Sequence, residues 1–537
     1  MKDIIKWYDG DLTLRLMLGM RYCERILSHE LDMRPHFAYT RHREKGEGFA
    51  HGCPGTLMQH AVGRGMDLMY NFEKHTGTKI SPRIESAYVK HFWEHLDEEF
   101  GMCLEFVNEN DPWRIELHNV RETVEALNLL IELRDDGMAY ETIEKILTGI
   151  PKIVSDDGRR FEPAKAVENG VIDKFTGSIG APQPMTAGRL TGPLTQYYKL
   201  TGDKRALEIA HNFALGTLDC FTDDGEMLES AGTHIHSVTS ALSGAAEYAA
   251  LTDDSEMLSK MERLYENPLG LPVIMTDFGW IKEQIRIPGQ VQGEVNQIGD
   301  MVSFCIALGK YFSDTKWFSR AETFMRGGVL PSQVLNSDFI KADEKPASDH
   351  TRDIPTRILG GYGFPMPASH LENEGSPINT LDVTQGANQS ICRVIENIVT
   401  VDKGILSINM LFSCDNRYAK IISSLPNTGE ISILPKKAGP VRVRIPENIV
   451  PQTLTLRIDG TDMDYNIDNG WMCFVAESYD MITVTWNPQT TVYHSNYIDT
   501  DYTVKKFGEQ TVSVTPIDGI YPMYDETDFI NSEEKQQ

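Results

Sequence analysis

The pattern GRLTGPLTQYYKLTGDKRALEIAHNFA (188–214) returns as SALSGAAEYAALTDDSEMLSKMERLYEN (240–267) and again as DMVSFCIALGKYFSDTKWFSRAETFM (300–325). Each copy reads as an apolar helix that ends in an aromatic residue, a short turn with aspartate, and a second, amphipathic helix. Repeated helical hairpins bury their apolar faces only against one another. The three copies therefore predict either a solenoid or a closed ring of helical hairpins.

Further segments with helical spacing extend this pattern on both sides and bring the total to about twelve helices. They cover residues 12–27, 56–75, 83–97, 120–134, 140–147 and 385–399. A superhelical solenoid of the tetratricopeptide type is the competing fold. The loops between hairpins are long and carry His, Trp and Asp, which suits regular stacking poorly. We therefore expect an (α/α)6 toroid.

After about Val399 the apolar residues alternate with period two and the turns shorten. Segments such as EISILP (430–435) and VRVRIP (441–446) are typical of strands joined by polar turns. The sequence predicts a toroid over residues 1–399, a β-sandwich over 400–515 and a polar tail over 516–537. TDYTVKKFGEQTVSV (500–514) is expected to add a strand.

The charge of the chain limits its partners. There are 51 Lys and Arg residues against 78 Asp and Glu, which gives a net charge of −27. Such a chain lacks the positive field that attracts nucleic acid or an anionic membrane. A few local arginines can still bind an acidic sugar. We expect a small carbohydrate as the partner, while the sequence leaves a homo-oligomer open.

Cysteine spacing and apolar runs bear on the compartment. The eight cysteines form no CxxC pair, so they indicate neither a disulfide framework nor a zinc site of local spacing. No apolar run approaches the roughly 18 residues of a membrane span, and MKDIIKWYDGDL at the start has no apolar signal region. The cytoplasm is the default expectation.

The candidate active site is the irregular stretch LPVIMTDFGWIKEQIRIPGQVQGEVNQIGDMVSF (271–304). Its carboxylates Asp277, Glu283 and Glu294 are the candidate catalytic residues. Cleavage of a glycosidic bond needs one carboxylic acid to protonate the leaving oxygen and a second group to assist on the other side. The alternative is an acidic, solvated loop between two core helices.

The same stretch supplies candidate substrate-binding residues. Trp280 would form an aromatic wall, which raises the pKa of a neighbouring carboxyl by desolvation. Arg286 could bind a uronate carboxylate in a bidentate contact, or it could form an ion pair with Glu283 or Asp277. Asn296 offers an amide for sugar hydroxyls.

Upstream residues complete the predicted cleft. Trp113 is a candidate for stacking on a sugar ring, and His118 lies near a helix start. His51 belongs to a loop rich in histidine and aromatic residues, which suggests a wall of the cleft. The spacing of His51, Cys53 and His60 matches no strong zinc pattern. We therefore expect no metal and no other cofactor.

Three segments bring the chain close to a known family. They are THIHSVTSALSGAAEYAALTDD (233–254), the run that begins GEVNQIGD (293–325), and DVTQGANQSICRVIENIV (382–399). Together they resemble segments of glycoside hydrolase family 127, the β-L-arabinofuranosidases, and its relatives. The resemblance implies a helical toroid followed by a β-sandwich, with His234 at the position of a pocket histidine.

The resemblance also implies roles for individual residues. Glu294 matches the family's metal-ligand glutamate, and Glu283 lies roughly where the family has its acid/base glutamate. Asn296, however, stands where the family has a cysteine, and Thr384, Gln385 and Gly386 occupy the region of two more cysteines, one of them the nucleophile. The zinc–thiolate mechanism is therefore not expected. A carboxylate site resembles instead the family 154 β-glucuronidases and the unsaturated glucuronyl hydrolases.

The sequence therefore predicts an exo-acting glycoside hydrolase that releases a terminal sugar by carboxylate acid–base catalysis. A uronic acid is one candidate for that sugar, and an L-arabinofuranose or a neutral hexose is the other. The rival hypotheses are a polysaccharide lyase on the same toroid and a non-catalytic carbohydrate-binding protein. A lyase would need a histidine or tyrosine base next to a group that neutralises the substrate's charge.

Overall fold

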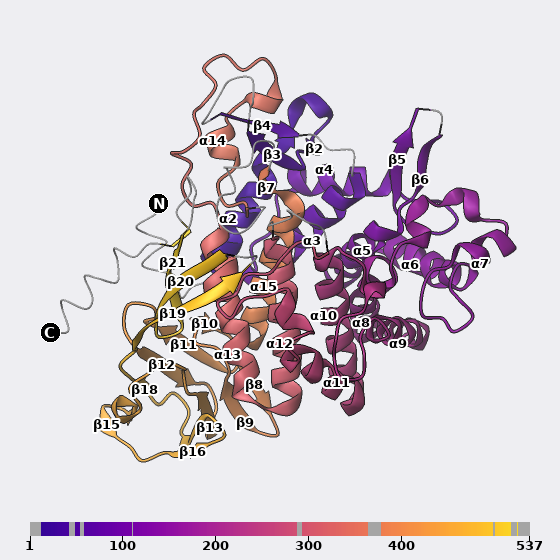
Figure 1. The fold of residues 1–537 in the computed structure, drawn as a ribbon. Coiled ribbons are helices and arrows are strands. Elements are labelled where there is room, and N and C mark those ends of the chain that lie inside the picture. The colour runs from indigo at the N-terminus through magenta and orange to yellow at the C-terminus, as the bar shows by residue number, and fades with distance from the viewer. Residues whose placement is uncertain are drawn as a thin grey trace.

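The computed structural model describes residues 12–41, 49–53, 58–109, 111–286, 293–363, 377–497, 500–516 and 523–524. Its helices form six pairs of one inner and one outer helix (Figure 1). The pairs are α3 (Met58–Thr76) with α4 (Pro82–Trp93), α5 (Val120–Arg134) with α6 (Gly137–Gly149), α8 (Thr191–Thr201) with α9 (Lys204–Leu218), α10 (Ile235–Thr252) with α11 (Ser255–Glu266), α12 (Val295–Phe312) with α13 (Thr315–Phe324), and α15 (Leu381–Asn397) with α2 (Leu12–Arg25).

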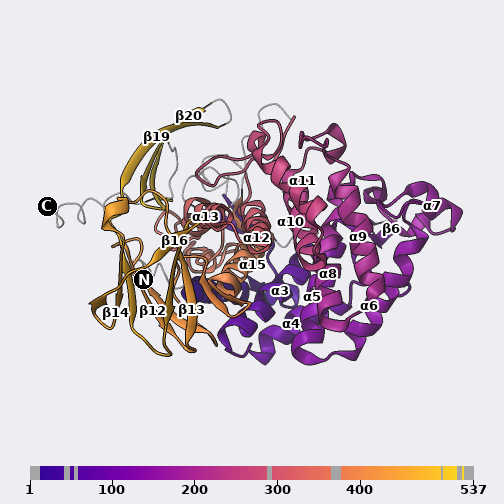
Figure 2. The same ribbon diagram turned by 90° about the horizontal axis from the view of Figure 1, so that it is seen from below.

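The inner helices close into a ring. Helices α3, α5, α8, α10, α12 and α15 pack in that order, and α15 then packs against α3. The view in Figure 2 runs down into this ring, with the outer helices around it. The (α/α)6 toroid predicted from the sequence is confirmed, and the open solenoid is excluded because the first and last inner helices are in contact. Short helices α7 (Pro163–Glu168) and α14 (Ile354–Arg357) lie in the connecting loops.

Aspartates in the turns explain why each hairpin folds locally. Asp136, Asp203, Asp254 and Asp314 each precede an outer helix and accept a hydrogen bond from a backbone N–H of its first turn. The residue before each aspartate is in the left-handed conformation, which ends the inner helix. An aspartate cap stabilises a helix by roughly 1 kcal/mol. The turn with aspartate that recurs in the sequence therefore ends the inner helix at its left-handed residue and begins the outer helix at its aspartate cap.

Two larger sheets follow the ring. One has the strand order β10-β11-β12-β18-β14-β15 and the other β16-β17-β13-β9-β8. The strands are β8 (Val399–Asp402), β9 (Ile405–Ile408), β10 (Cys414–Asp415), β11 (Ala419–Ser423), β12 (Glu430–Pro435), β13 (Gly439–Arg444), β14 (Thr455–Ile458), β15 (Thr461–Asp462), β16 (Asn466–Asp468), β17 (Trp471–Ala476) and β18 (Ile482–Thr485). Buried and less buried residues alternate along β12 and β11, as the sequence pattern indicates. A toroid followed by a β domain is the fold class that we expected.

A third sheet covers the loop that was singled out as the active-site stretch. It contains β19 (Thr490–Tyr497), β20 (Thr500–Phe507) and β21 (Gln510–Thr515), paired antiparallel. Tyr497 and Tyr502 of this sheet pack against Trp280 at 6.1 and 5.4 Å between ring centroids. The segment 500–514 therefore belongs to a separate sheet with its own contacts to the ring, whereas most of the predicted tail lies outside the described residues.

Small strands fix the N-terminal part of the chain against the start of α15. Strand β3 (Ala38–Arg41) pairs with β4 (Ala50–Cys53) on one side and with β7 (Pro377–Thr380) on the other. Two further pairs are β1 (Leu27–Ser28) with β2 (Arg34–Pro35) and β5 (Leu104–Asn108) with β6 (Asp111–Ile115). Among the described helices, none has the length and apolarity needed to cross a membrane.

A buried charge network joins the ring to the sheets. Arg444 of β13 donates to Glu322 of α13 and, at 2.8 Å, to Glu509 in the turn between β20 and β21. Arg326 donates to the other oxygen of Glu322 at 2.7 Å. All four side chains are buried. Breaking a buried pair by removing one partner leaves an uncompensated charge, which costs more than the pair itself contributes.

We expect Arg444→Met to lower the free energy of unfolding by about 3–5 kcal/mol, because Glu509 would stay buried without its partner. Urea denaturation followed by circular dichroism measures this. The control is Arg457→Met, because Arg457 forms an exposed ion pair with Asp462 in the same domain and its loss should leave the free energy of unfolding nearly unchanged. Equal losses in the two variants would show that the network does not join the domains.

Candidate active site

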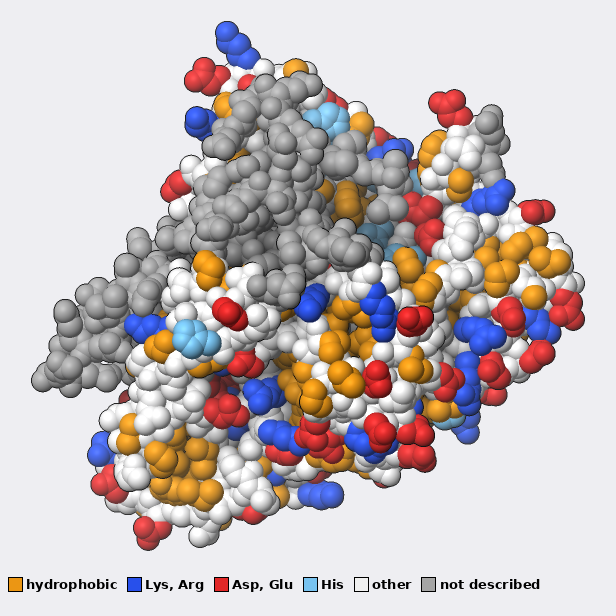
Figure 3. Space-filling view, viewed as in Figure 1, with side chains coloured by type: hydrophobic (Ala, Val, Ile, Leu, Met, Phe, Trp, Pro, Cys, Tyr) orange, Lys and Arg blue, Asp and Glu red, His pale blue; other side chains and the backbone are white. Residues whose placement is uncertain are grey.

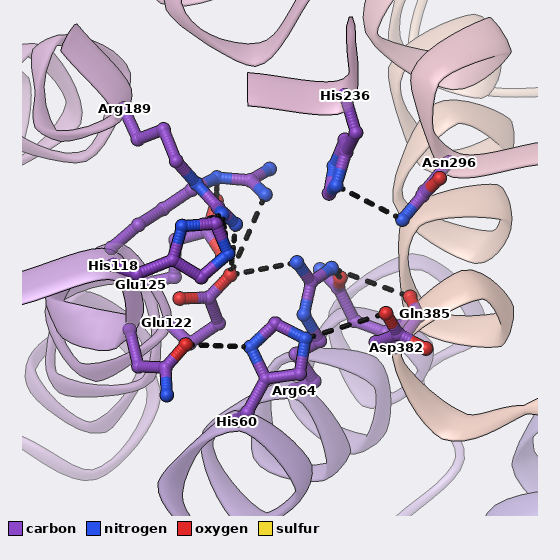
Figure 4. A network of polar contacts seen from close by, with 12 residues as sticks. His60, Arg64, His118, Glu122, Glu125, Arg189, His236, Asn296, Asp382 and Gln385 are labelled. Carbon is purple, nitrogen blue, oxygen red and sulfur yellow. Dashed lines mark hydrogen bonds and ion pairs between the residues drawn. The ribbon is translucent and has the colours of Figure 1, made fainter. Parts of the chain in front are cut away.

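Polar side chains from all six inner helices meet at one end of the ring (Figure 4). Because the inner helices run parallel, their N-terminal ends lie together, and each contributes a residue from its first turn or from just before it. These residues are His60 (α3), Glu122 (α5), Arg189 (before α8), His236 (α10), Asn296 (α12) and Asp382 (α15). Helix N-termini carry positive partial charge, so this end of the ring favours carboxylates. In the space-filling view, histidine and acidic side chains show deep in a recess beside the β5–β6 hairpin (Figure 3).

Asp382 is held as a carboxylate. One of its oxygens lies 3.3 Å from Nε2 of His60, whose Nδ1 lies 2.9 Å from the amide oxygen of Asn119. That amide is oriented by donating its own N–H to Glu105. The two nitrogens of His60 thus face the amide oxygen of Asn119 on one side and the carboxylate of Asp382 on the other. Burial opposes ionisation of Asp382, but His60 and Arg64 outweigh it and hold the pKa of Asp382 well below its usual range.

Glu122 is clamped between two buried guanidinium groups. Its Oε1 accepts from Arg64 at 2.7 Å and from Arg189 at 2.6 Å. Arg64 also donates to the side-chain oxygen of Gln385 at 2.6 Å. Burial opposes the charge on Glu122, yet Arg189 and Arg64 keep its pKa well below the usual value. This triad ties α3, α5, α15 and the turn before α8 into one frame.

His118 is neutral and has a defined tautomer. Arg189 donates to its Nε2 at 2.6 Å, so this nitrogen carries no proton. Its Nδ1 lies 3.0 Å from the carbonyl oxygen of Met185 and donates to it. Burial and the charge of Arg189 lower the pKa of His118 well below its ordinary value. Its ring lies between those of His60 and His234, at 6.0 and 5.6 Å between centroids.

Glu283 is a protonated acid. Its side chain is 6% exposed, and its Oε1 lies 3.0 Å from Nε2 of His234. The other oxygen has no hydrogen-bond partner among the residues that the structure describes. Burial, with the nearby charge of Asp382, raises the pKa of Glu283 well above its ordinary value. His234 is oriented in turn by Ser237, whose hydroxyl lies 2.7 Å from Nδ1.

Glu294 is a second neutral carboxyl. It precedes α12, but its side chain makes no capping hydrogen bond and points to His236, 3.4 Å away. Asn296 also contacts His236, with 3.3 Å between the amide nitrogen and Nδ1. Burial and the neighbouring Glu283 and Asp382 raise the pKa of Glu294 well above the usual value. The site therefore contains two neutral carboxyls, Glu283 and Glu294, beside the ionised carboxylates of Asp382 and Glu122.

Three other residues of the predicted stretch lie elsewhere. Asp277 is exposed and accepts from Ser495 of β19 at 3.0 Å. Trp280 is fully buried beneath the β19–β21 sheet, packed edge-on against Tyr502, so it offers no face to a sugar. Arg286 is exposed and donates to two backbone carbonyl oxygens, at 3.1 and 3.3 Å. The structure does not bring these three side chains to the cluster.

Two upstream candidates are also placed apart from it. Trp113 is 42% exposed on the β5–β6 hairpin and packs edge-on against His95 and Phe106. His51, on β4, lies 3.0 Å from the hydroxyl of Thr40 in the small N-terminal sheet. The structure gathers the other predicted residues at the helix starts, namely His234, His118, Asn296, Glu283 and Glu294.

Sequence reasoning missed several members of the cluster, namely Arg64, Glu122, Arg189, His236 and Asp382, and considered His60 only as a metal ligand. A signal was present, because His60, Glu122 and Asp382 stand in the first turns of their helices. Arg121 shows the same effect. It pairs with Glu125 at 3.2 Å, and little of either side chain is exposed.

Comparison with known proteins shows the fold. No family model matches the chain, and no curated protein matches it by sequence. Among solved structures, a β-arabinofuranosidase of glycoside hydrolase family 127 aligns over 94% of this chain and 81% of its own, with TM-score 0.61 and 12% identity. The family 127 β-L-arabinofuranosidase of Geobacillus stearothermophilus T6 aligns over 94% and 80%, with TM-score 0.57 and 12% identity. A third structure, named as a glycoside hydrolase, aligns over 84% and 77%, with TM-score 0.56 and 12% identity. The chain thus has the fold of these enzymes.

The residues present do not fit the zinc that the resemblance to family 127 implies. Asn296 and Gly386 lie against each other, so close that a side chain at Gly386 would collide with Asn296. An amide, Gln385 and a glycine therefore fill the place of the expected thiolates. Zinc favours thiolate and imidazole ligands in a tetrahedral set. Within the described ranges, no group of three or more His, Cys, Asp or Glu side chains could hold a metal ion.

Stability should depend on pH through Glu294. Its folded-state pKa is raised, so the folded chain keeps a proton that the unfolded chain releases above about pH 4.5. The stabilising contribution is present below that pH and is lost as pH rises. We expect Glu294→Gln to unfold at a higher urea concentration than the native protein at pH 8, with the difference shrinking towards pH 5.

Glu98→Gln is the matched control, because Glu98 is an exposed glutamate on the surface. This variant should change the urea midpoint by the same small amount at every pH. A Glu294→Gln variant whose difference from the native protein is the same at pH 5 and pH 8 would contradict a neutral Glu294.

Proposed function

We propose that the protein is a glycoside hydrolase that removes a terminal sugar by carboxylate acid–base catalysis. The observation that carries the proposal is the pairing of opposite protonation states in one buried site, with neutral Glu283 near ionised Asp382. Environments that push two carboxyl pKa values apart assign one group as the acid and the other as the base or nucleophile. The fold shared with family 127 enzymes is compatible with this chemistry, but the roles rest on the site itself.

Glu283 is the general acid in this proposal. Its Oε2 is buried and has no hydrogen-bond partner in the described part of the chain, so we assign the transferred proton to this oxygen. The proton moves from Glu283 to the glycosidic oxygen as the bond from that oxygen to the anomeric carbon breaks. His234, held by Ser237, fixes the other oxygen of Glu283 and so orients the acid.

Asp382 assists from its ionised state. In an inverting reaction it takes a proton from the attacking water, and in a retaining reaction it bonds to the anomeric carbon before water releases the sugar. His60 keeps the carboxylate charged and oriented in either case. The anomer formed first, read by proton nuclear magnetic resonance, distinguishes the two routes.

The contacts of the arginines favour a neutral sugar as the substrate, because none of the three arginines considered is left to bind a uronate carboxylate. Arg286, the sequence-based candidate for a uronate carboxylate, is bound to backbone carbonyls away from the cluster. Arg64 and Arg189 are both already engaged by the single carboxylate of Glu122. We propose a neutral pentose or hexose at the cleaved end, with a uronic acid as the alternative.

Turnover of 4-nitrophenyl glycosides tests the proposal. The panel contains β-D-glucoside, β-D-galactoside, α- and β-L-arabinofuranosides and β-D-glucuronide, each with and without EDTA. At least one should release 4-nitrophenol in both conditions. Glu283→Gln and Asp382→Asn should each lower kcat/KM by about 10²–10⁴, whereas the exposed-site variant Glu98→Gln should leave it within twofold.

Two outcomes would contradict the proposal. Loss of turnover in EDTA would show that a metal is needed in spite of the missing thiolates. No turnover of any glycoside, under conditions where the protein is folded, would move the assignment to a lyase or to a binding protein.

The pH profile gives a further expectation. The rate should fall at acid pH as Asp382 takes up a proton and at alkaline pH as Glu283 loses one, so the lowered and raised pKa values predict a plateau that includes neutral pH. In His60→Gln, Asp382 loses the imidazole that lowers its pKa, and the acid limb should move to higher pH. His75→Gln is the control, because His75 pairs with Glu396 at the other end of α3. An acid limb that moves equally in both variants would contradict the claim that His60 lowers the pKa of Asp382.

A further inference from the structure

A second pocket lies on the outside of the ring, away from the carboxyl cluster. It has a volume of about 180 Å³. Its walls come from α11, α13 and the loop between α11 and α12, and β19 reaches the same place through Ser495. These elements lie together on the side of the ring that faces the β19–β20 hairpin (Figure 2). The lining includes Tyr265, Met275, Thr276, Asp277, Arg320 and Phe324.

The lining combines an apolar floor with charged groups at the rim. Phe324 is buried and Tyr265 is half-buried, so the two present apolar surface. Arg320 is exposed, and among the described residues it has no hydrogen bond or ion pair. Asp277 keeps one carboxylate oxygen on Ser495 and has a second oxygen for another donor. An apolar floor with a few well-placed polar groups is the usual composition of a small-molecule site.

The pocket is held open by its surroundings. The N–H of Thr276 donates to the carbonyl of Trp280 at 2.8 Å, and the N–H of Trp280 donates to the hydroxyl of Thr276 at 2.8 Å. Tyr265 is fixed from behind by Trp317, edge-on at 5.0 Å between ring centroids. A preformed wall of this kind needs little ordering when a ligand binds.

The pocket and the carboxyl cluster use opposite ends of one loop. Asp277 lies in the pocket, whereas Glu283, in the same loop, points inward to His234. The buried Trp280 lies between them in sequence and fills the space beneath the third sheet. The pocket is therefore a separate site and not an extension of the cluster.

We propose that this pocket is an accessory binding site for one neutral sugar unit. The choice of a sugar as the ligand rests on the proposed glycoside hydrolase function. The fit of one sugar unit is argued from the size and lining of the pocket itself. Sugars present C–H faces that pack on aromatic side chains and hydroxyls that both donate and accept, which matches Tyr265 and Phe324 with Asp277 and Arg320. Pockets for drug-sized ligands have volumes of about 300–1,000 Å³, so the smaller volume of this pocket suits a single sugar unit.

Fluorine nuclear magnetic resonance of the full chain labelled with 5-fluorotryptophan tests the site directly. The chain has seven tryptophans, and Trp317→Phe identifies the signal of Trp317 behind the pocket. D-glucose, D-galactose and L-arabinose are the probes, each titrated to tens of millimolar. We expect at least one to shift the Trp317 signal saturably, with at least fivefold weaker binding in Arg320→Gln and unchanged binding in Arg83→Gln, which alters an exposed arginine of α4.

A Trp317 signal that no sugar shifts, or an Arg320→Gln variant that binds as the native protein does, would overturn the proposal. Its failure can be told apart from failure of the proposed function. A shift of the Trp317 signal without turnover of any 4-nitrophenyl glycoside would overturn the proposed catalysis and support the accessory site. Turnover without a shift would support the catalysis and overturn the accessory site.

Discussion

The ion triad of Glu122 between Arg64 and Arg189 is the interaction on which the rest of the site depends. It is fully buried and joins inner helices α3 and α5 to the turn before α8. Such a triad is stable only with every partner present, because a lone buried charge costs several kcal/mol. It also places positive charge at the centre of the cluster. That charge lowers the pKa of His118 and helps to keep nearby carboxylates ionised.

Closure of the ring brings the carboxyl groups of the site next to the residues that set their protonation states. Asp382 approaches His60 and Arg64 only because α15 packs against α3, and there it becomes an ionised carboxylate. Glu283 and Glu294 enter from loops between later helices and meet neutral histidines, so burial keeps them protonated. Similar side chains thus take opposite protonation states because they meet different neighbours, His60 and Arg64 for Asp382 and neutral histidines for the two glutamates. This division is what acid–base cleavage of a glycosidic bond requires.

The sequence was informative wherever the deciding interactions are local. Aspartate caps and apolar periodicity act within one hairpin, so the helices and the toroid could be predicted. Glu283 and Glu294 were found because they stand on an irregular loop and just before a helix. His60 and Asp382, by contrast, are 322 residues apart, and no spacing in the sequence shows their contact. Trp280 was placed in the cleft because the sheet that buries it is distant in sequence.

The central claim is that Glu283 is protonated and Asp382 ionised in the folded protein at neutral pH. Infrared difference spectroscopy of the native protein against Glu283→Gln and Asp382→Asn measures both states directly. The account predicts that Glu283→Gln removes a carbonyl band of a protonated carboxylic acid, whereas Asp382→Asn removes only carboxylate bands. Loss of a carboxylate band in Glu283→Gln, or of a protonated-acid band in Asp382→Asn, would contradict it.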